Sequence, residues 1–366
     1  MNAPHVYVHV PFCARRCSYC DFAIAVRRTI PVRDYLDALA REASSTAIAG
    51  VPATLYLGGG TPSLIGGDGV AEVARMTGAL PGVEEFTVEA NPDDVTPRAA
   101  AAWVRSGVNR LSIGAQSFHP HVLAWMHRTH EVAAIAQAVR TARAEGITNV
   151  SLDLIFALPA ELHRDWRADL DQALALDPDH VSLYGLTVES GTALARWIDR
   201  GASHPADERS YEEEYLEAHE RLGAAGYRFY EVSNAARPGR EAVHNRAYWR
   251  LAPYLGLGPS AHSFDGASRW WNEPVYARWI RQVRERGAAV AGREVLDGAQ
   301  RALELLYLSL RTADGIRVAD APPRLASLAQ SWVRSGWAVM AEEGPERRLA
   351  LTPAGWLRLD ELVATV

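Results

Sequence analysis

Short apolar runs and longer amphipathic segments alternate through the first two thirds of the chain. The runs are rich in β-branched and aromatic residues and end at Gly, Pro or polar positions, which predicts β-strands. Between them, apolar residues recur at helical spacing, as in residues 33–45, where Tyr35, Leu36 and Leu39 fall on one side. The predicted strands span residues 5–10, 54–57, 85–90, 110–116, 149–156 and 180–186.

Strand–helix repeats of this length predict a parallel sheet with right-handed crossovers. Six repeats are too few for a closed eight-stranded barrel. We therefore expect an α/β fold with a partial, open (β/α)6 barrel of the TIM type over residues 1–230, with residues 227–233 as a further strand at its edge. In such barrels the chemistry lies at the carboxyl ends of the strands.

The last third of the chain has a different pattern. Residues 231–294 are predicted to be an irregular, aromatic-rich connecting segment. Residues 295–366 then read as two helices, a two-stranded hairpin and a last helix over 353–363, which resembles a small winged-helix domain. Acidic residues accompany Arg347 and Arg348 there, so no basic face is left to neutralise phosphates. We expect this domain to contact protein or act as a lid rather than bind nucleic acid.

Composition is that of an ordinary soluble globular protein, with 48% hydrophobic and 22% charged residues in 366. The net charge of −6 gives no bulk attraction to nucleic acid. No apolar run is long enough to span a membrane and no secretory signal is visible, so a cytoplasmic protein is expected. The chain contains no lysine, which excludes Schiff-base chemistry on a protein lysine and the Walker A phosphate loop.

All three cysteines of the chain, Cys13, Cys17 and Cys20, lie together just after the first predicted strand. Their spacing lets one loop present three thiolates to one metal centre. A zinc site would need a fourth ligand such as a distant His, and three buried thiols without metal are a further alternative. A four-iron cluster is usually held by four thiolates, so three would leave one iron open to a small molecule.

Polar and glycine residues follow the other predicted strands. Gly60 and Thr61 belong to a glycine run whose bare backbone can approach a ligand closely. Glu89, Gln116 and Asp153 lie at or near three successive strand ends, where their alternative role is to cap the following helices. Arg128 lies in residues 126–130, at the start of a predicted helix, and could pair with a carboxylate of a ligand or with Glu89. These residues together form a candidate pocket.

The C-x-x-x-C-x-x-C spacing resembles that of the radical S-adenosylmethionine (SAM) superfamily. The resemblance implies a [4Fe–4S] cluster held by Cys13, Cys17 and Cys20, with SAM chelating the open iron. It also implies contacts to SAM from Tyr7, Tyr19, Gly60, Thr61, Glu89, Gln116, Arg128 and Asp153. Motifs along nearly the whole chain are similar to those of the oxygen-independent coproporphyrinogen III oxidases and their relatives. These are YVHVPFC, YCDF, GGGTPS, EANP, GAQSF, DLIFALP and HNRAYW.

Two branches of that family differ in function. The oxidases carry a fourth cysteine two residues after the third and a longer N-terminal arm, whereas this chain has Phe22 at that place and begins six residues before Tyr7. The branch of HemW-type haem chaperones has Phe there and the motif His-Asn-x-x-Tyr-Trp, which starts here at His244. The resemblance therefore implies a chaperone that delivers haem to apo-haemoproteins. The oxidase activity is the alternative, and a non-catalytic cluster-binding protein is a third.

The resemblance also implies a haem site near His244, and the chemistry of this segment is consistent with it. Haem iron takes an imidazole as axial ligand, and Tyr248, Trp249 and Tyr254 could cover the flat apolar macrocycle. The alternative is that His244 hydrogen-bonds locally within an irregular loop. In the family the cluster reduces SAM to methionine and a 5′-deoxyadenosyl radical, and the sequence leaves open whether this chain cleaves SAM or only binds it. The implied partner is an apo-haemoprotein at the membrane, with transient membrane association, and a homodimer is left open.

Overall fold

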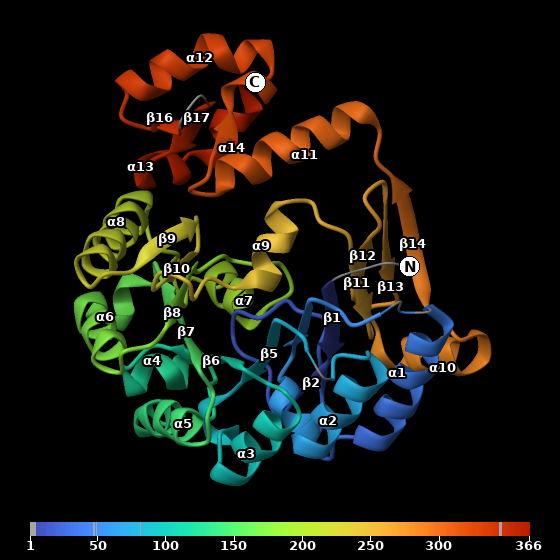
Figure 1. The fold of residues 1–366 in the computed structure, drawn as a ribbon. Coiled ribbons are helices and arrows are strands. Elements are labelled where there is room, and N and C mark those ends of the chain that lie inside the picture. The colour runs from blue at the N-terminus through green and yellow to red at the C-terminus, as the bar shows by residue number, and fades with distance from the viewer. Residues whose placement is uncertain (1–4, 47, 49, 81, 344–345) are drawn as a thin grey trace.

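The computed structural model describes residues 5–46, 48, 50–80, 82–343 and 346–366. Its centre is the predicted open barrel, since six strands pair in parallel in chain order (Figure 1). The sheet does not close on itself, which confirms the partial (β/α)6 fold. The six strands are β1 (His5–Val10), β4 (Thr54–Gly59), β5 (Glu85–Ala90), β6 (Arg110–Gln116), β7 (Asn149–Phe156) and β8 (His180–Gly185).

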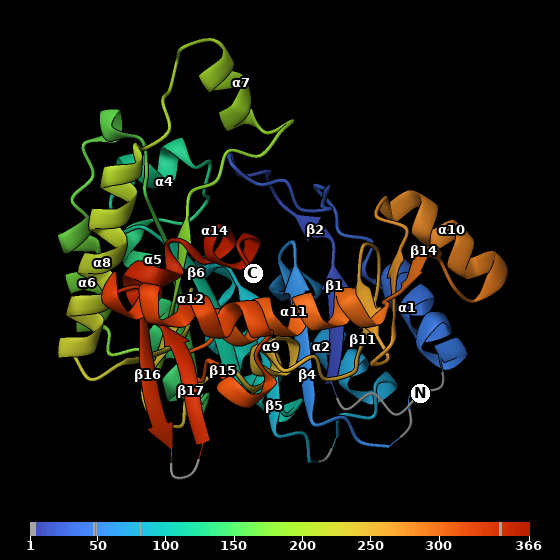
Figure 2. The ribbon, with the colours of Figure 1, turned by 90° about the horizontal axis from the view of Figure 1, so that it is seen from above.

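Helices cover the outer face of the sheet because every second residue of each strand is apolar and faces them. Val6, Val8, Leu55 and Leu57 are fully buried in one core with these helices. The alternate residues face inward and are mostly polar, so the barrel has an apolar outer core and a polar interior. The helices are α1 (Val32–Thr46), α2 (Gly66–Met76), α3 (Pro97–Arg105), α4 (Pro120–Trp125), α5 (Val132–Ala144), α6 (Trp166–Ala175) and α8 (Glu208–Ala224). The short helix α7 (Ala193–Asp199) instead lies beyond the carboxyl ends of the strands (Figure 2).

The expectation that residues 231–294 are irregular is wrong, because most of this segment is regular structure. β11 pairs in parallel with β1, and two short strands and β14 then extend the sheet outward. These strands span three to six residues, which is too short to reveal a two-residue period. The elements are β9 (Arg228–Glu231), β10 (Asn234–Ala236), α9 (Val243–Trp249), β11 (Tyr254–Leu257), β12 (His262–Phe264), β13 (Ser268–Asn272), α10 (Tyr276–Arg286) and β14 (Val290–Val295).

The C-terminal region has the predicted order of helices and hairpin, except that the last helix is divided into two short ones. Its first helix, α11, lies with α9 across the open side of the barrel (Figure 2). None of the helices in the described ranges has the length and apolarity needed to cross a bilayer. The elements are α11 (Gly298–Arg311), β15 (Ile316–Arg317), α12 (Pro323–Arg334), β16 (Ala338–Glu343), β17 (Glu346–Leu351), α13 (Pro353–Trp356) and α14 (Leu359–Ala364).

A buried carboxylate joins the barrel to its extension. Glu42, on α1, is 3% exposed and accepts hydrogen bonds from Gly258 N (2.7 Å), Asn272 Nδ2 (2.7 Å) and Trp279 Nε1 (3.3 Å). Burial raises the pKa of Glu42 to about 7, although the three donors act in the opposite direction. This one side chain fixes the β11–β13 segment against the first helix.

Replacing Glu42 with Ala should destabilise the fold, because three buried donors would lose their acceptor. We expect the free energy of unfolding to fall by about 2 to 4 kcal/mol. Urea denaturation followed by circular dichroism measures the change. Arg41→Ala, at the exposed neighbouring position of the same helix, should leave the midpoint nearly unchanged. Equal stability of the two variants would contradict the assigned role.

Candidate functional site

A pocket of about 400 Å³ lies at the carboxyl ends of the parallel strands. It collects residues that are separated in sequence by more than a hundred positions, as expected for barrel strand ends. Of the predicted site residues only Tyr7 and His244 are outside it. Those that line it are Cys13, Cys17, Cys20, Tyr19, Gly60, Thr61, Glu89, Gln116, Arg128 and Asp153.

The cysteine loop is fixed at both ends by two short strands, β2 (Phe12–Cys13) and β3 (Ala25–Val26). Its middle is tied down as well, since Ser18 N donates to Met126 O (3.1 Å) and Leu194 N donates to Ser18 O (2.8 Å). Through the second contact, the first turn of α7 is held against the cysteine loop. The thiols are therefore presented by a braced backbone rather than by a free loop.

The thiols themselves fit a metal cluster. All three are free and partly buried. Burial raises the pKa of Cys13 and raises the pKa of Cys20 to about 11, which disfavours the thiolate form. Coordination by a metal stabilises the thiolate and so offsets the cost of burying its charge. No group of three His, Cys, Asp or Glu in the described residues surrounds a single metal ion. In a four-iron cluster each thiolate binds an iron of its own, so its sulfurs need not converge on one point.

The glycine run brings its backbone close to the cysteine loop. A Cβ on Gly60 would lie 2.6 Å from Phe12 O and 2.9 Å from Pro11 C, so only glycine fits beside the strand that leads to Cys13. Gly59 has φ of 112° and donates its N–H to Glu89 Oε2 (3.2 Å). Glu89 also accepts from Tyr56 Oη (2.8 Å), and burial raises its pKa to about 7. Backbone groups and one carboxyl thus line this wall of the pocket.

Arg128 forms the opposite wall and does not pair with Glu89. Its Nη2 donates to Asn91 Oδ1 (2.7 Å) and Gly114 O (2.8 Å), and its Nη1 donates to Cys17 Sγ (3.6 Å). The buried Nε of Arg128 has no hydrogen-bond partner. A cation beside the thiols with an unused donor suits an anionic ligand such as a carboxylate. Asp153 of β7 lies in the same pocket and accepts a hydrogen bond from Ser112 Oγ of β6 (3.0 Å).

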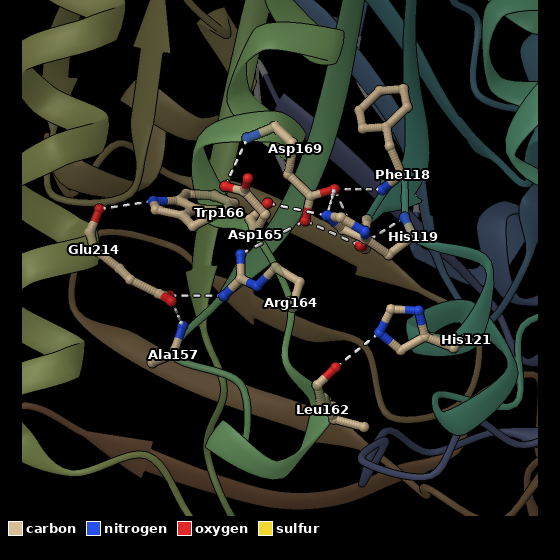
Figure 3. Close-up of polar contacts among 12 residues, drawn as sticks. Phe118, His119, His121, Ala157, Leu162, Arg164, Asp165, Trp166, Asp169 and Glu214 are labelled. Atoms are coloured by element: carbon tan, nitrogen blue, oxygen red, sulfur yellow. Dashed lines mark hydrogen bonds and ion pairs between the residues drawn. The ribbon is translucent and has the colours of Figure 1, made fainter.

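A polar network behind the pocket holds the end of β6 (Figure 3). Gln116 ends this strand at a positive φ of 65°, and the following residues turn toward α6. The buried Asp169 of α6 accepts from Ser117 Oγ (2.9 Å) and Phe118 N (2.6 Å). Arg164 bridges Asp169 (3.6 Å) and Glu214 of α8 (2.7 Å). Side chains of two outer helices therefore hold the backbone that directly follows Gln116.

Sequence reasoning missed several residues that line the pocket, namely Asn91, Ser112, His127, Tyr184 and Glu189. Ser112 is an inward-facing position of a predicted strand, and its place followed from the two-residue period. Tyr184 is likewise an inward-facing position of a predicted strand, β8. Asn91 directly follows β5, and His127 and Glu189 lie in connecting segments, where no periodicity marks them.

The two predicted residues outside the pocket lie in the barrel interior. Tyr7 stacks on Tyr56 with ring centroids 6.0 Å apart, and its hydroxyl lies 3.2 Å from His9 Nδ1. His244 is 1% exposed, with Nδ1 hydrogen-bonded to Thr54 Oγ1 (2.7 Å) and Nε2 to Tyr248 Oη (2.8 Å). Burial lowers the pKa of His244 to about 3, so its ring is neutral. In this conformation neither ring nitrogen is open to an iron atom.

Comparison with known proteins agrees with this geometry. A family model described as the Radical SAM superfamily matches residues 7–173. The chain is 37% identical to the heme chaperone HemW of Mycobacterium tuberculosis over 374 aligned residues, which cover 99% of this chain and 94% of that relative. The chain belongs to the HemW family of radical SAM proteins. A second family member, the heme chaperone HemW of Synechocystis, is 36% identical over 86% of this chain and 80% of its own length.

A solved structure shows the same fold. The coproporphyrinogen III oxidase HemN of Escherichia coli aligns with 100% of this chain and 90% of its own, with a TM-score of 0.82 and 22% identity. Membership of the radical SAM superfamily implies a [4Fe–4S] cluster and SAM as cofactors. The three thiols, the unused donor of Arg128 and the exposed glycine backbone in one pocket are compatible with both.

Gly60→Ala should impair cluster assembly, because the added methyl group would displace the backbone before Cys13. We expect fewer irons and sulfides per chain after anaerobic reconstitution, measured by iron and sulfide analysis and by absorbance. Gly223→Ala is the control, since a Cβ there meets nothing within 4 Å. A fully loaded Gly60→Ala variant would show that the contact with Phe12 is not needed to position the thiols.

Proposed function

We propose that this chain is a haem chaperone, which holds a [4Fe–4S] cluster and SAM in the strand-end pocket and passes haem to apo-haemoproteins. The proposal is carried by the 37% identity to a heme chaperone over 99% of the chain, because the likeness includes the C-terminal region as well as the barrel. Clustered free thiols also suit a reducing cytoplasm.

In this proposal Cys13, Cys17 and Cys20 hold three irons and leave the fourth to SAM. When bound, the cluster supplies the electron that can cleave SAM; the chain's own residues bind and orient. The backbone at Gly60 and Thr61 would accept or donate to the amino acid part of SAM, and Arg128 would offset the negative charge of the thiolates. Tyr19, Glu89, Gln116 and Asp153 would complete the nucleotide site. Tyr7 would act only from behind the pocket wall.

The oxidase activity is the second candidate, since the fold is that of a coproporphyrinogen III oxidase. Phe22 is 61% exposed at the rim of the pocket, at the place where the oxidases carry a further cysteine. Phe22 in place of that cysteine favours haem delivery. So does the identity of 37% to a heme chaperone, against 22% to the oxidase. A carrier whose cluster is only structural is the third candidate, and cleavage of SAM distinguishes it.

Anaerobically reconstituted protein should bind haem and transfer it to an apo-haemoprotein, and should leave the propionates of coproporphyrinogen III intact. The Soret spectrum follows binding and transfer, and mass spectrometry follows decarboxylation. Formation of 5′-deoxyadenosine per reduced cluster is measured in the same samples. Cys17→Ala, which removes one cluster ligand, separates steps that need the cluster from those that do not. If the protein decarboxylated coproporphyrinogen III and did not bind haem, the oxidase activity would be the function and the chaperone proposal would be wrong.

A further inference from the structure

A second pocket, of about 420 Å³, lies on the open side of the barrel. There α11 crosses in front of β1 and the β11–β13 extension, and α9 lies beside α11, against β4 (Figure 2). We refer to it as the lateral pocket, and it is lined mainly by aromatic and aliphatic side chains. Its lining includes Tyr248, Trp249, Tyr254, Phe264, Leu308 and His262.

The walls of the lateral pocket are rigid. Tyr248 meets Tyr254 edge to face with ring centroids 4.6 Å apart, and Tyr254 packs near Phe264. Arg269 on β13 donates to both carboxylate oxygens of Glu304 on α11 (3.0 and 2.8 Å), which fixes α11 over the sheet. Arg269 is thereby occupied and does not present a free cation. A flat, largely apolar ligand suits such walls.

Three histidines lie around this pocket, and they differ in what their ring nitrogens contact. His9 is bonded to Tyr7 Oη (3.2 Å) and Ala23 O (3.0 Å), and both nitrogens of His244 are occupied by Thr54 and Tyr248. His262, at the start of β12, is exposed, and no hydrogen bond to either of its ring nitrogens is found among the described residues. Its ring stacks on Trp271 with centroids 5.9 Å apart, which orients it.

We propose that the lateral pocket is the haem site and that His262 is the axial ligand of the haem iron. The inference rests on the proposed function and adds to it where the cargo binds. Imidazole is a common haem ligand, and the aromatic walls would cover the macrocycle. The strand-end pocket is the weaker choice, although His127 lines it, because a haem there would compete with SAM for the same space.

The lateral site explains the aromatic part of the HNRAYW segment without using its histidine as a ligand. Tyr248 and Trp249 line the pocket, while His244 holds Tyr248 in place through its Nε2. Trp249 is further fixed by Arg311, whose guanidinium lies 4.3 Å from the indole centroid. His244 is then a positioning residue for the pocket wall.

Haem titration of full-length reconstituted protein tests the ligand. His262→Ala should weaken haem binding by about tenfold or more and shift the Soret band away from that of histidine-ligated haem, since a coordinate bond is removed. Added imidazole should restore the spectrum, because it can occupy the vacated position. His204→Ala, at an exposed histidine between α7 and α8, should behave as wild type. An unchanged affinity and spectrum for His262→Ala would overturn the assignment.

A second pair of variants tests the pocket without touching the ligand. Leu308→Trp places a larger side chain in the lateral pocket and should abolish haem binding, whereas Leu303→Trp, at a 55% exposed position of the same helix, should not. Normal haem binding by Leu308→Trp would also overturn the proposal. If His127→Ala alone abolished binding, the cargo would lie in the strand-end pocket. If the wild-type chain bound no haem, the proposed function itself would fail.

Discussion

The structure depends on one arrangement: the outer helices bury an apolar face of the six parallel strands, while the inner face of the same strands is mostly polar and also largely buried. An inner face of this kind is stable only if its buried polar groups find partners. At the floor of the barrel several of them find one another, although Thr87 Oγ1 and Arg110 Nε are buried there without a hydrogen-bond partner among the described residues. Glu85, for example, accepts from the backbone N–H groups of Val243 and His244 at the start of α9 (2.7 and 3.1 Å). At the rim, the buried Nε of Arg128 is left without a partner, and a ligand can supply it.

Because the sheet stays open, the polar interior must also be closed from the side. α9 and α11 do this from two directions. His244 of α9 bonds to Thr54 on β4, and Arg311 of α11 pairs with Glu231 of β9 (2.8 Å). His244, which the resemblance suggested as a haem ligand, therefore helps to close the open side of the barrel. Chemistry that needs an open imidazole has to be found elsewhere on the molecule.

The barrel could be predicted from the sequence because its strands are long enough to show a period and each is followed by an amphipathic helix. The strand-end residues followed for the same reason, since parallel strands bring their carboxyl ends to one edge. The β11–β13 extension could not be predicted. Its strands take their register from β1 and are fixed by a side chain more than two hundred residues away, Glu42. Whether a histidine is open or occupied likewise depends on such distant partners, as the contrast between His244 and His262 shows.

The two pockets are separated by the inward side chains of a single strand. Tyr7 and His9 of β1 line the lateral pocket, and the Nε2 of His9 is bonded to Ala23 O, three residues after Cys20. Gly59, on the other side, packs so closely on His9 that a Cβ would lie 2.6 Å from its ring. Gly59 lines the strand-end pocket, whereas Tyr7 and His9 line the lateral pocket, so these groups form a thin wall between the two. If a ligand in one pocket displaced His9, the binding free energy of a ligand in the other pocket would change, and this coupling would be equal in both directions. With haem in the proposed site, this wall would lie between the cargo and the pocket of the cysteines.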